Sequence, residues 1–285
     1  MKNLKTAIVV DSGCGIKNNT IKDVYVVPMI VVKVENKQET SFRDGIDITS
    51  KEIIDDMLNG IVYKTASPVM GECAELIEKL AKEYDEVYIL SMPQPVSGTY
   101  NQWKLIASDY KNVYVYNTMA PAHNMKWLLE DIQKIKNVNH EKVEELANDY
   151  YKKTNIGLVV RDLKYAIRGG RVGVLKGGIA ILLKLNVVLD LTAHGFENVG
   201  TTNKIEKIFP IVAKVLQEQC GYNGNNIEKL CIYTSNTKDP KFNCEAVAKE
   251  LKDGFGFKEV EFAEFPPVFI SHAGPNYVGF SIKVK

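Results

Sequence analysis

The chain has 285 residues, of which 45% are hydrophobic and 25% are charged. This composition is typical of a folded protein and excludes a disordered chain or a fibrous repeat. Its 36 basic and 35 acidic side chains nearly cancel, so no overall field attracts nucleic acid or an acidic membrane. We therefore expect no nucleic-acid partner, and recognition through a local pocket or patch.

The N-terminal segment and the cysteines bear on cellular location. Residues 7–10 form too short an apolar run for a signal peptide. The longest apolar run, 179–183, is far shorter than the roughly 20 residues that cross a bilayer. The five cysteines are odd in number and have no CxxC spacing, which argues against a disulfide framework and a zinc site. The sequence thus predicts a cytoplasmic protein without a transmembrane segment or a metal.

Short apolar runs alternate with helical patterns through the first half of the chain. Strands are expected at 5–10, 86–91 and 112–116, and helices at about 50–59, 68–83, 98–109 and 121–136. This alternation predicts a parallel sheet with helices on both faces. Residues 23–42 break the pattern, and we expect a hairpin or another excursion there.

Two of these helices carry start signals. Residues Thr49 to Glu52 match a capping box for the helix at 50–59. Ser67 is placed to cap the next helix, because Pro68 suits a first helical turn. We therefore expect this second helix to begin near residue 68.

The pattern changes after a further helix at 141–153. Strands are expected near 186–191, 195–200, 229–235, 258–264 and 277–284, and helices at 204–219 and 242–252. The closing strands lie close together with few helices between them, which favours antiparallel or mixed pairing. We place a domain boundary near residue 155, which gives an N-terminal domain 1–155 and a C-terminal domain 156–285.

Hydroxyl groups collect in the loops where a ligand is expected. In an open α/β sheet, ligands bind where the strands end and helices begin. The loops expected there contain Asp11-Ser12-Gly13, Lys64-Thr65-Ala66-Ser67, Ser97-Gly98-Thr99 and Asn117-Thr118. Neutral donors beside a helix start favour a carboxylate or a phosphate. Each of these residues is also a possible simple helix cap, but Gly98 and two nearby prolines favour ligand contact at Ser97.

Two further features leave alternatives open. His272 falls in a predicted turn between two strands, and an imidazole near Ser97 would permit a serine hydrolase, although Ser97 lacks the G-x-S-x-G motif. Residues 161–184 carry six basic side chains and one acidic one. This segment is either a solvated face or a surface that meets phosphate or a partner. It contains no P-loop motif.

Six short motifs, in this order, resemble the DegV family over nearly the whole chain. They are Val10-Asp11-Ser12, Phe42-Arg43-Asp44-Gly45, Thr65-Ala66-Ser67-Pro68, Ser97-Gly98-Thr99-Tyr100, Leu163-Lys164-Tyr165 through Gly169-Gly170-Arg171, and His272-Ala273-Gly274-Pro275. The resemblance implies two α/β domains related to the dihydroxyacetone-kinase fold. The first would hold a parallel sheet, the second a mixed sheet, and a lipid site would lie between them.

The resemblance also implies a function. The protein would be the non-catalytic, acyl-binding subunit of a bacterial fatty-acid kinase, with a long-chain fatty acid as its ligand and no other cofactor. It would present the carboxylate to a separate ATP-binding kinase subunit, which makes acyl phosphate for phospholipid synthesis. An apolar path for the tail would include 179–183 or Phe269-Ile270. By this resemblance the carboxylate would be held by Thr65, Ser97, Gly98, Thr99 and His272, and the kinase would dock at Arg171 and Arg168.

Other functions remain open at this stage. One is a hydrolase or acyl transferase with Ser97 as nucleophile and His272 as base. Another is a lipid sensor that docks a different partner through the basic segment. The chain also departs from the family pattern at residues 93–96 and at Thr65-Ala66-Ser67-Pro68, which leaves the preferred acyl length and the kinase pairing undetermined.

Overall fold

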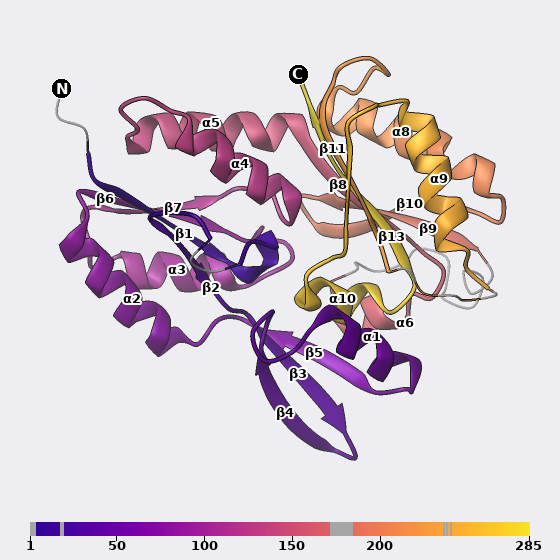
Figure 1. Ribbon diagram of the computed structural model, residues 1–285, viewed down its shortest axis with the longest axis horizontal. Coiled ribbons are helices and arrows are strands. Elements are labelled where there is room, and N and C mark those ends of the chain that lie inside the picture. Colours follow the sequence, from indigo (N-terminus) through magenta and orange to yellow (C-terminus); the bar gives the residue numbers. More distant parts are fainter. Residues whose placement is uncertain (1–3, 18–19, 172–184, 236, 238, 240) are drawn as a thin grey trace.

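Three sheets organise the chain (Figure 1). The computed structural model describes residues 4–17, 20–171, 185–235, 237, 239 and 241–285. The strands are β1 (Thr6–Asp11), β2 (Val24–Val27), β3 (Ile30–Glu35), β4 (Gln38–Arg43), β5 (Val62–Ala66), β6 (Glu86–Ser91), β7 (Val113–Asn117), β8 (Thr154–Val160), β9 (Asn186–Thr192), β10 (Gly195–Thr202), β11 (Ile227–Thr234), β12 (Val260–Ala263) and β13 (Tyr277–Val284). The helices are α1 (Ser50–Leu58), α2 (Met70–Glu83), α3 (Thr99–Ala107), α4 (His123–Gln133), α5 (His140–Lys153), α6 (Lys164–Arg168), α8 (Ile208–Cys220), α9 (Cys244–Phe255) and α10 (Pro267–Ala273).

The first sheet is parallel throughout, with the strand order β2-β1-β6-β7. Successive side chains of a strand point to opposite faces. Ala7 and Val9 of β1 therefore pack with α2 and α3, whereas Ile8 and Val10 pack on the side of α4 and α5. Helices cover both faces, which confirms the prediction from the alternating strands and helices.

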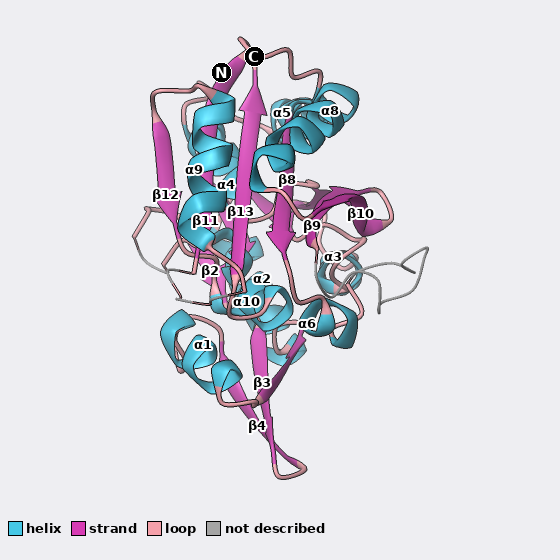
Figure 2. Cartoon of the chain, turned by 90° about the vertical axis from the view of Figure 1, so that its right-hand side faces the viewer, coloured by secondary structure: helices cyan, strands magenta, loops and turns pink. Residues whose placement is uncertain are grey.

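The second sheet has six strands in the order β10-β9-β8-β13-β11-β12. Neighbouring strands are antiparallel, except that β11 and β12 are parallel. The predicted mixed sheet is thereby confirmed. Figure 2 shows β13 between β8 and β11. Every residue of β13 is buried, because α8 and α9 pack on one face of this sheet and α4 and α5 on the other.

A continuous apolar core joins the two larger sheets. Helix α5 contacts strands of both sheets, and α4 contacts β8 and β13 of the mixed sheet. The same cluster of buried side chains includes Val10 of β1, Leu128 of α4 and Leu158 of β8. The division into domains 1–155 and 156–285 stays a prediction. The predicted boundary, residue 155, is the second residue of β8, which begins at Thr154.

The segment 23–42 forms β2 and the β3–β4 hairpin, as the expected excursion. β5 pairs with the other edge of β3, so that β4, β3 and β5 make a small antiparallel sheet. This sheet lies at the bottom of Figure 1, beside α1 and α10. The excursion therefore brings the first half of the chain into contact with α10, close to the C-terminal end of the sequence.

Three local predictions are wrong. His272 lies in α10 rather than in a turn, since Pro267 begins a short helix there. Thr65 lies within β5 of the small sheet, not in a loop after a strand of the parallel sheet. Ser67 does not cap α2, which starts at Met70 without a side-chain cap. The capping box at Thr49, by contrast, is confirmed by both of its hydrogen bonds.

The cysteine thiols lie away from solvent. All five cysteines are buried free thiols, and burial raises the pKa of Cys14 to about 12. In the part of the chain that the structure describes, no helix is long and apolar enough to cross a membrane. The same residues contain no group of three or more His, Cys, Asp or Glu side chains placed to hold a metal.

Candidate functional site

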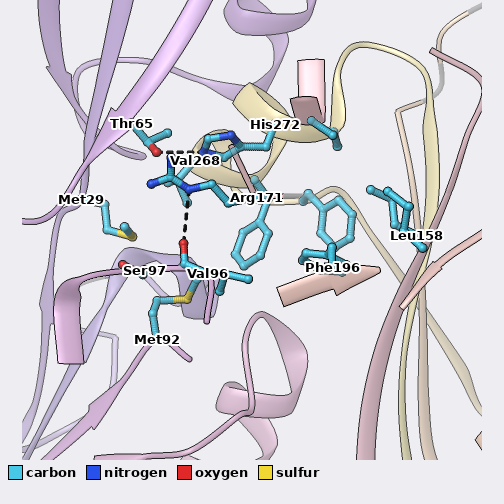
Figure 3. Close-up of a pocket in the computed structure, with 15 residues that line it drawn as sticks. Met29, Thr65, Met92, Val96, Ser97, Leu158, Arg171, Phe196, Val268 and His272 are labelled. Carbon is cyan, nitrogen blue, oxygen red and sulfur yellow. Dashed lines mark hydrogen bonds between the residues drawn. The ribbon is translucent and has the colours of Figure 1, made fainter. Parts of the chain in front are cut away.

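A narrow apolar cavity lies beside α10, between the small sheet and the mixed sheet (Figure 3). The space between its lining atoms is about 660 Å³, including the part open to solvent, and little of it is wide enough for a water molecule. Such a narrow lumen suits an alkyl chain better than a ring system. Its apolar lining consists of Met29, Met92, Val96, Leu158, Ala166, Leu189, Phe196, Phe265, Val268, Phe269 and Ala273.

Polar side chains of four residues interrupt this lining: Thr65, Ser97, Arg171 and His272. Interactions connect these four residues to one another. Thr65 shares a hydrogen bond with His272, whose pKa is lowered in part by the charge of Arg171. Arg171 in turn donates a hydrogen bond to the backbone carbonyl of Val96, the residue before Ser97. Figure 3 shows them on one side of the cavity, with Leu158 and Phe196 on the other. The cavity therefore has a polar end and an apolar end.

His272 is a neutral hydrogen-bonding group. Its Nε2 atom lies 2.8 Å from Thr65 Oγ1. Burial, helped by the charge of Arg171, lowers the pKa of His272 to about 3. Its Nδ1 atom is buried without a hydrogen-bond partner among the described residues. A buried N–H without a partner is rarer than a buried lone acceptor, so we assign the proton to Nε2, which then donates to Thr65. The Thr65 hydroxyl is thereby free to donate to a ligand.

Ser97 supplies a second hydroxyl at the polar end. It precedes α3 and accepts a hydrogen bond from the backbone N–H of Thr99 at 3.3 Å. Its hydroxyl also bonds to that of Thr99, which is fully buried. When Thr99 donates to Ser97, the Ser97 proton is free to point at a ligand. This loop thus offers a donor of the same kind as Thr65.

Arg171 adds positive charge to the polar end. Its side chain donates to the carbonyl oxygens of Val96, at 3.3 Å, and of Gly169. Within the described ranges, no carboxylate forms an ion pair with it. A half-buried guanidinium remains charged, and a charge without a counter-ion favours an anionic ligand.

Two buried aspartates hold the elements that surround the cavity. Asp44 accepts the backbone N–H of Val268 at 2.9 Å and the Ser12 hydroxyl at 2.5 Å, and so fixes the start of α10. Asp11 accepts hydrogen bonds from the backbone N–H groups of Met92, at 2.9 Å, and of Gly13, at 3.1 Å. Met92 directly follows β6, and Gly13 follows β1. Burial raises the pKa of Asp11 to about 7 and that of Asp44 to about 6. Neither lines the cavity, so both position it.

A glycine allows α10 to approach the loop after α6. A Cβ atom on Gly169 would lie 1.9 Å from His272 Nδ1, a separation that no side chain tolerates. The same happens at Gly274, whose Cβ would meet the Tyr165 ring at 2.4 Å and whose φ is +85°. Gly169 therefore leaves room for the His272 ring, and Gly274 leaves room for the Tyr165 ring.

The structure brings some of the predicted residues together and separates others. Thr65, Ser97, His272 and Arg171 all line the cavity. Gly98 and Thr99 lie behind Ser97 and do not line it. Arg168 lines an adjoining groove together with Lys164 and Arg161.

The tail path was predicted only in part. Phe269 lines the cavity, but Ile270 is buried elsewhere, and 179–183 lies outside the described residues. The sequence analysis missed Met29, Met92 and Phe196. Each follows or lies in a strand, and their shared apolar character was the only available signal.

The geometry gives little support to nucleophilic catalysis. In the described part of the chain, no hydrogen bond joins Ser97 to His272. Their hydroxyl and imidazole groups are engaged with Thr99 and Thr65 instead. A serine nucleophile needs a base within hydrogen-bonding reach and a third group that orients this base. Among the described residues, no partner orients His272 through Nδ1.

Comparison with known proteins settles the family. A family model described as "Uncharacterised protein, DegV family" matches residues 5–285. The chain belongs to the DegV family. A DegV domain-containing protein of Clostridium acetobutylicum is 26% identical to it over 308 aligned positions, which cover 99% of each protein.

Two solved structures of the family share the fold. The structure titled "Fatty Acid Binding of a DegV family Protein from Thermus thermophilus" has a TM-score of 0.80 at 23% identity, and covers 99% of this chain and 100% of that one. The Streptococcus pneumoniae Fatty Acid Kinase (Fak) B3 protein, loaded with linoleic acid, has a TM-score of 0.74 at 16% identity, with 99% and 100% coverage. The DegV fold of this chain is therefore shared along its whole length.

Proposed function

We propose that this DegV protein binds a long-chain fatty acid in the cavity beside α10. The observation that carries the proposal is a narrow apolar lumen with Thr65, Ser97, Arg171 and His272 at one end. Each methylene removed from water contributes about 0.8 kcal/mol, so the lumen favours an alkyl tail. The carboxylate would accept hydrogen bonds from Thr65 and Ser97, with Thr99, Gly98 and His272 supporting these donors.

The family supports this ligand class. The Thermus thermophilus protein is described by its fatty-acid binding, and the Streptococcus pneumoniae protein is loaded with linoleic acid. In this chain the Arg171 guanidinium, which has no ion-pair partner among the described residues, offers an anion one full positive charge, and the Thr65 and Ser97 hydroxyls offer neutral donors. A carboxylate is tolerated away from water only when several donors meet it.

We further propose that the chain performs no chemistry alone and presents the carboxylate to a separate ATP-dependent kinase subunit, for acyl-phosphate formation in the cytoplasm. The likeness to the Fak B3 protein supports this role. Arg168 and Arg171 would meet the partner. Arg168 lies on the adjoining groove outside the cavity, whereas Arg171 lies in the cavity wall, so their roles can be separated by mutation.

Mass spectrometry of the purified protein tests the ligand. We expect the native mass to exceed the chain mass by one fatty acid, which is released after denaturation and solvent extraction. Protein stripped of lipid should take up one equivalent of added oleic or palmitic acid. A protein that is empty as purified and also fails to bind either acid would refute the proposal. A burst of product from an activated acyl ester, lost in Ser97→Ala, would favour the hydrolase instead.

A kinase assay tests the partner. Lipid-loaded protein should form acyl phosphate when ATP and an ATP-binding fatty-acid kinase subunit are added. Arg168→Ala should keep its fatty acid but lower the rate, and Arg171→Ala should do the same if its role is docking. Lipid loss in Arg171→Ala, with normal loading in Arg168→Ala, would assign Arg171 to the carboxylate. An unchanged rate in both variants would reject the docking role, and a lipid-bound protein that no kinase phosphorylates would favour a sensor.

A further inference from the structure

The apolar end of the fatty-acid cavity lies on one face of the mixed sheet. Leu158 of β8 and Leu189 of β9 stand directly opposite each other, and both line the cavity. On its other side Leu158 stands opposite Gly279 of β13, and Gly279 stands opposite Tyr233 of β11. Residues that are directly opposite in a sheet share a face. The cavity therefore covers the first two residues of a row that crosses four strands.

Gly279 leaves a notch in this row, and the ring of Phe265 fills the notch. A Cβ atom on Gly279 would lie 2.5 Å from Cζ of Phe265, so the ring rests directly on the glycine. Phe265 is buried and itself lines the cavity. The lumen above Leu158 and Leu189 thus meets Phe265 at the point where the row reaches β13.

Surrounding groups hold Phe265 in the notch. Its ring stacks with the rings of Tyr233, Tyr277 and Phe269, whose centroids lie 4.2, 5.0 and 5.5 Å away. Its backbone N–H donates to the Tyr277 hydroxyl at 3.0 Å. Its carbonyl oxygen accepts a hydrogen bond from the Ser50 hydroxyl at 3.1 Å. Because the ring and both backbone groups are held, Phe265 is a fixed wall of the lumen.

We propose that Phe265, seated on Gly279, sets the maximum length of the acyl chain that the cavity holds. This inference rests on the proposed fatty-acid ligand and adds the residue that determines its length. The terminal methyl group of the longest chain that fits contacts the Phe265 ring. Each methylene buried before that point raises the affinity by about fourfold. A further methylene stays in water or displaces the ring, so the affinity stops rising with chain length.

Two substitutions change this wall in opposite directions. Phe265→Leu removes part of the ring and opens the notch, which gives the lumen room for at least one more methylene. Gly279→Ala places a Cβ 2.5 Å from the ring, whereas an ordinary contact begins at 3.4 Å. Tyr233 and Tyr277 block two sides of the ring, so it moves into the lumen by the difference of about 0.9 Å. The alanine adds no backbone strain, because Gly279 lies in a strand.

Competition against a fluorescent fatty acid measures the effect as the ratio of the affinity for arachidic acid to that for palmitic acid. Compared with the wild-type protein, this ratio should rise by at least about fourfold in Phe265→Leu. It should fall by a similar factor in Gly279→Ala. A wild-type ratio in either folded variant would overturn the proposal.

Two matched controls make the same changes on the opposite face of the mixed sheet. Phe255→Leu alters a buried ring of α9. Gly157→Ala crowds the Phe280 ring, which lies 2.3 Å from the position of the new Cβ. Both controls should lower the Tm and leave the affinity ratio unchanged. A shift of the ratio in the controls as large as that in Phe265→Leu and Gly279→Ala would also overturn the proposal.

A crystal structure of the wild-type protein with stearic acid tests the proposal without a variant. The terminal methyl group should lie within about 4.5 Å of the Phe265 ring. A chain that ends elsewhere in the cavity, out of contact with Phe265, would overturn the length limit and leave the fatty-acid function intact. Failure of the wild-type protein to bind any of these acids would instead refute the fatty-acid function, and the length limit with it.

Discussion

Gly169 offers a sharp test of how the fatty-acid site is built. Its backbone is right-handed helical, with φ −72° and ψ −14°, so Gly169→Ala adds no backbone strain. The new Cβ would lie 1.9 Å from His272 Nδ1, whereas an ordinary contact begins at 3.4 Å. The ring must therefore move by the difference of about 1.5 Å, which takes Nε2 out of hydrogen-bonding range of Thr65.

The lost hydrogen bond sets the size of the effect. Leaving a buried partner unsatisfied costs about 1–3 kcal/mol, so we expect a Kd for oleic acid about 5- to 150-fold higher than that of the wild-type protein. Displacement of a fluorescent fatty acid would measure it. The control is Gly170→Ala, because no atom lies within 4 Å of its new Cβ. Its φ of +67° should lower the Tm but leave the affinity unchanged. Wild-type affinity and Tm in Gly169→Ala would refute the reasoning.

Three further predictions follow from the site. Ser97→Ala should weaken oleic acid binding by about 10- to 150-fold, because one charge-assisted hydrogen bond is lost. The control Ser108→Ala, at the far end of α3, should bind oleic acid like the wild-type protein. Equal oleic acid affinities of the two variants would count against the role of Ser97. Phe196→Ala should enlarge the apolar end, so that mass spectrometry finds longer acyl chains in the variant; an unchanged lipid profile would contradict this. Burial raises the folded-state pKa of Asp44 to about 6 from 3.8, so the folded state holds the proton more tightly and its stability falls as the pH rises between these values. Urea unfolding at several pH values should show that the free energy of unfolding falls with rising pH more steeply in the wild-type protein than in Asp44→Asn. The same pH dependence of this free energy in both proteins would disprove the prediction.

The strands and helices of the two large sheets were accessible from the sequence because each is locally encoded. The run from Ala7 to Val10 is apolar on both faces of a strand, and the helix that begins at Ser50 carries its own capping box. In such elements hydrophobic period and end signals agree. The mixed sheet was predicted from the short spacing of its strands for the same reason.

The contacts of the site were less accessible because they join distant segments. Thr65 and His272 lie 207 residues apart, and Asp44 and Val268 lie 224 apart. The helix that carries His272 has seven residues, too few to display a helical period. Its start is fixed by Asp44 rather than by a local cap. The motifs therefore identified the residues, but only the fold revealed which of them line the cavity and which hold it in place.

The position of β13 has a consequence for how this protein acquires its shape. This strand separates β8 from β11, yet Val160 and its partner Tyr277 are far apart along the chain. Until β13 inserts, both neighbours present an unpaired edge that can recruit another chain. Pairing over such separations is slow, so we expect insertion of β13 to limit the refolding rate. Aggregation should compete at high protein concentration, and should be strongest before that step.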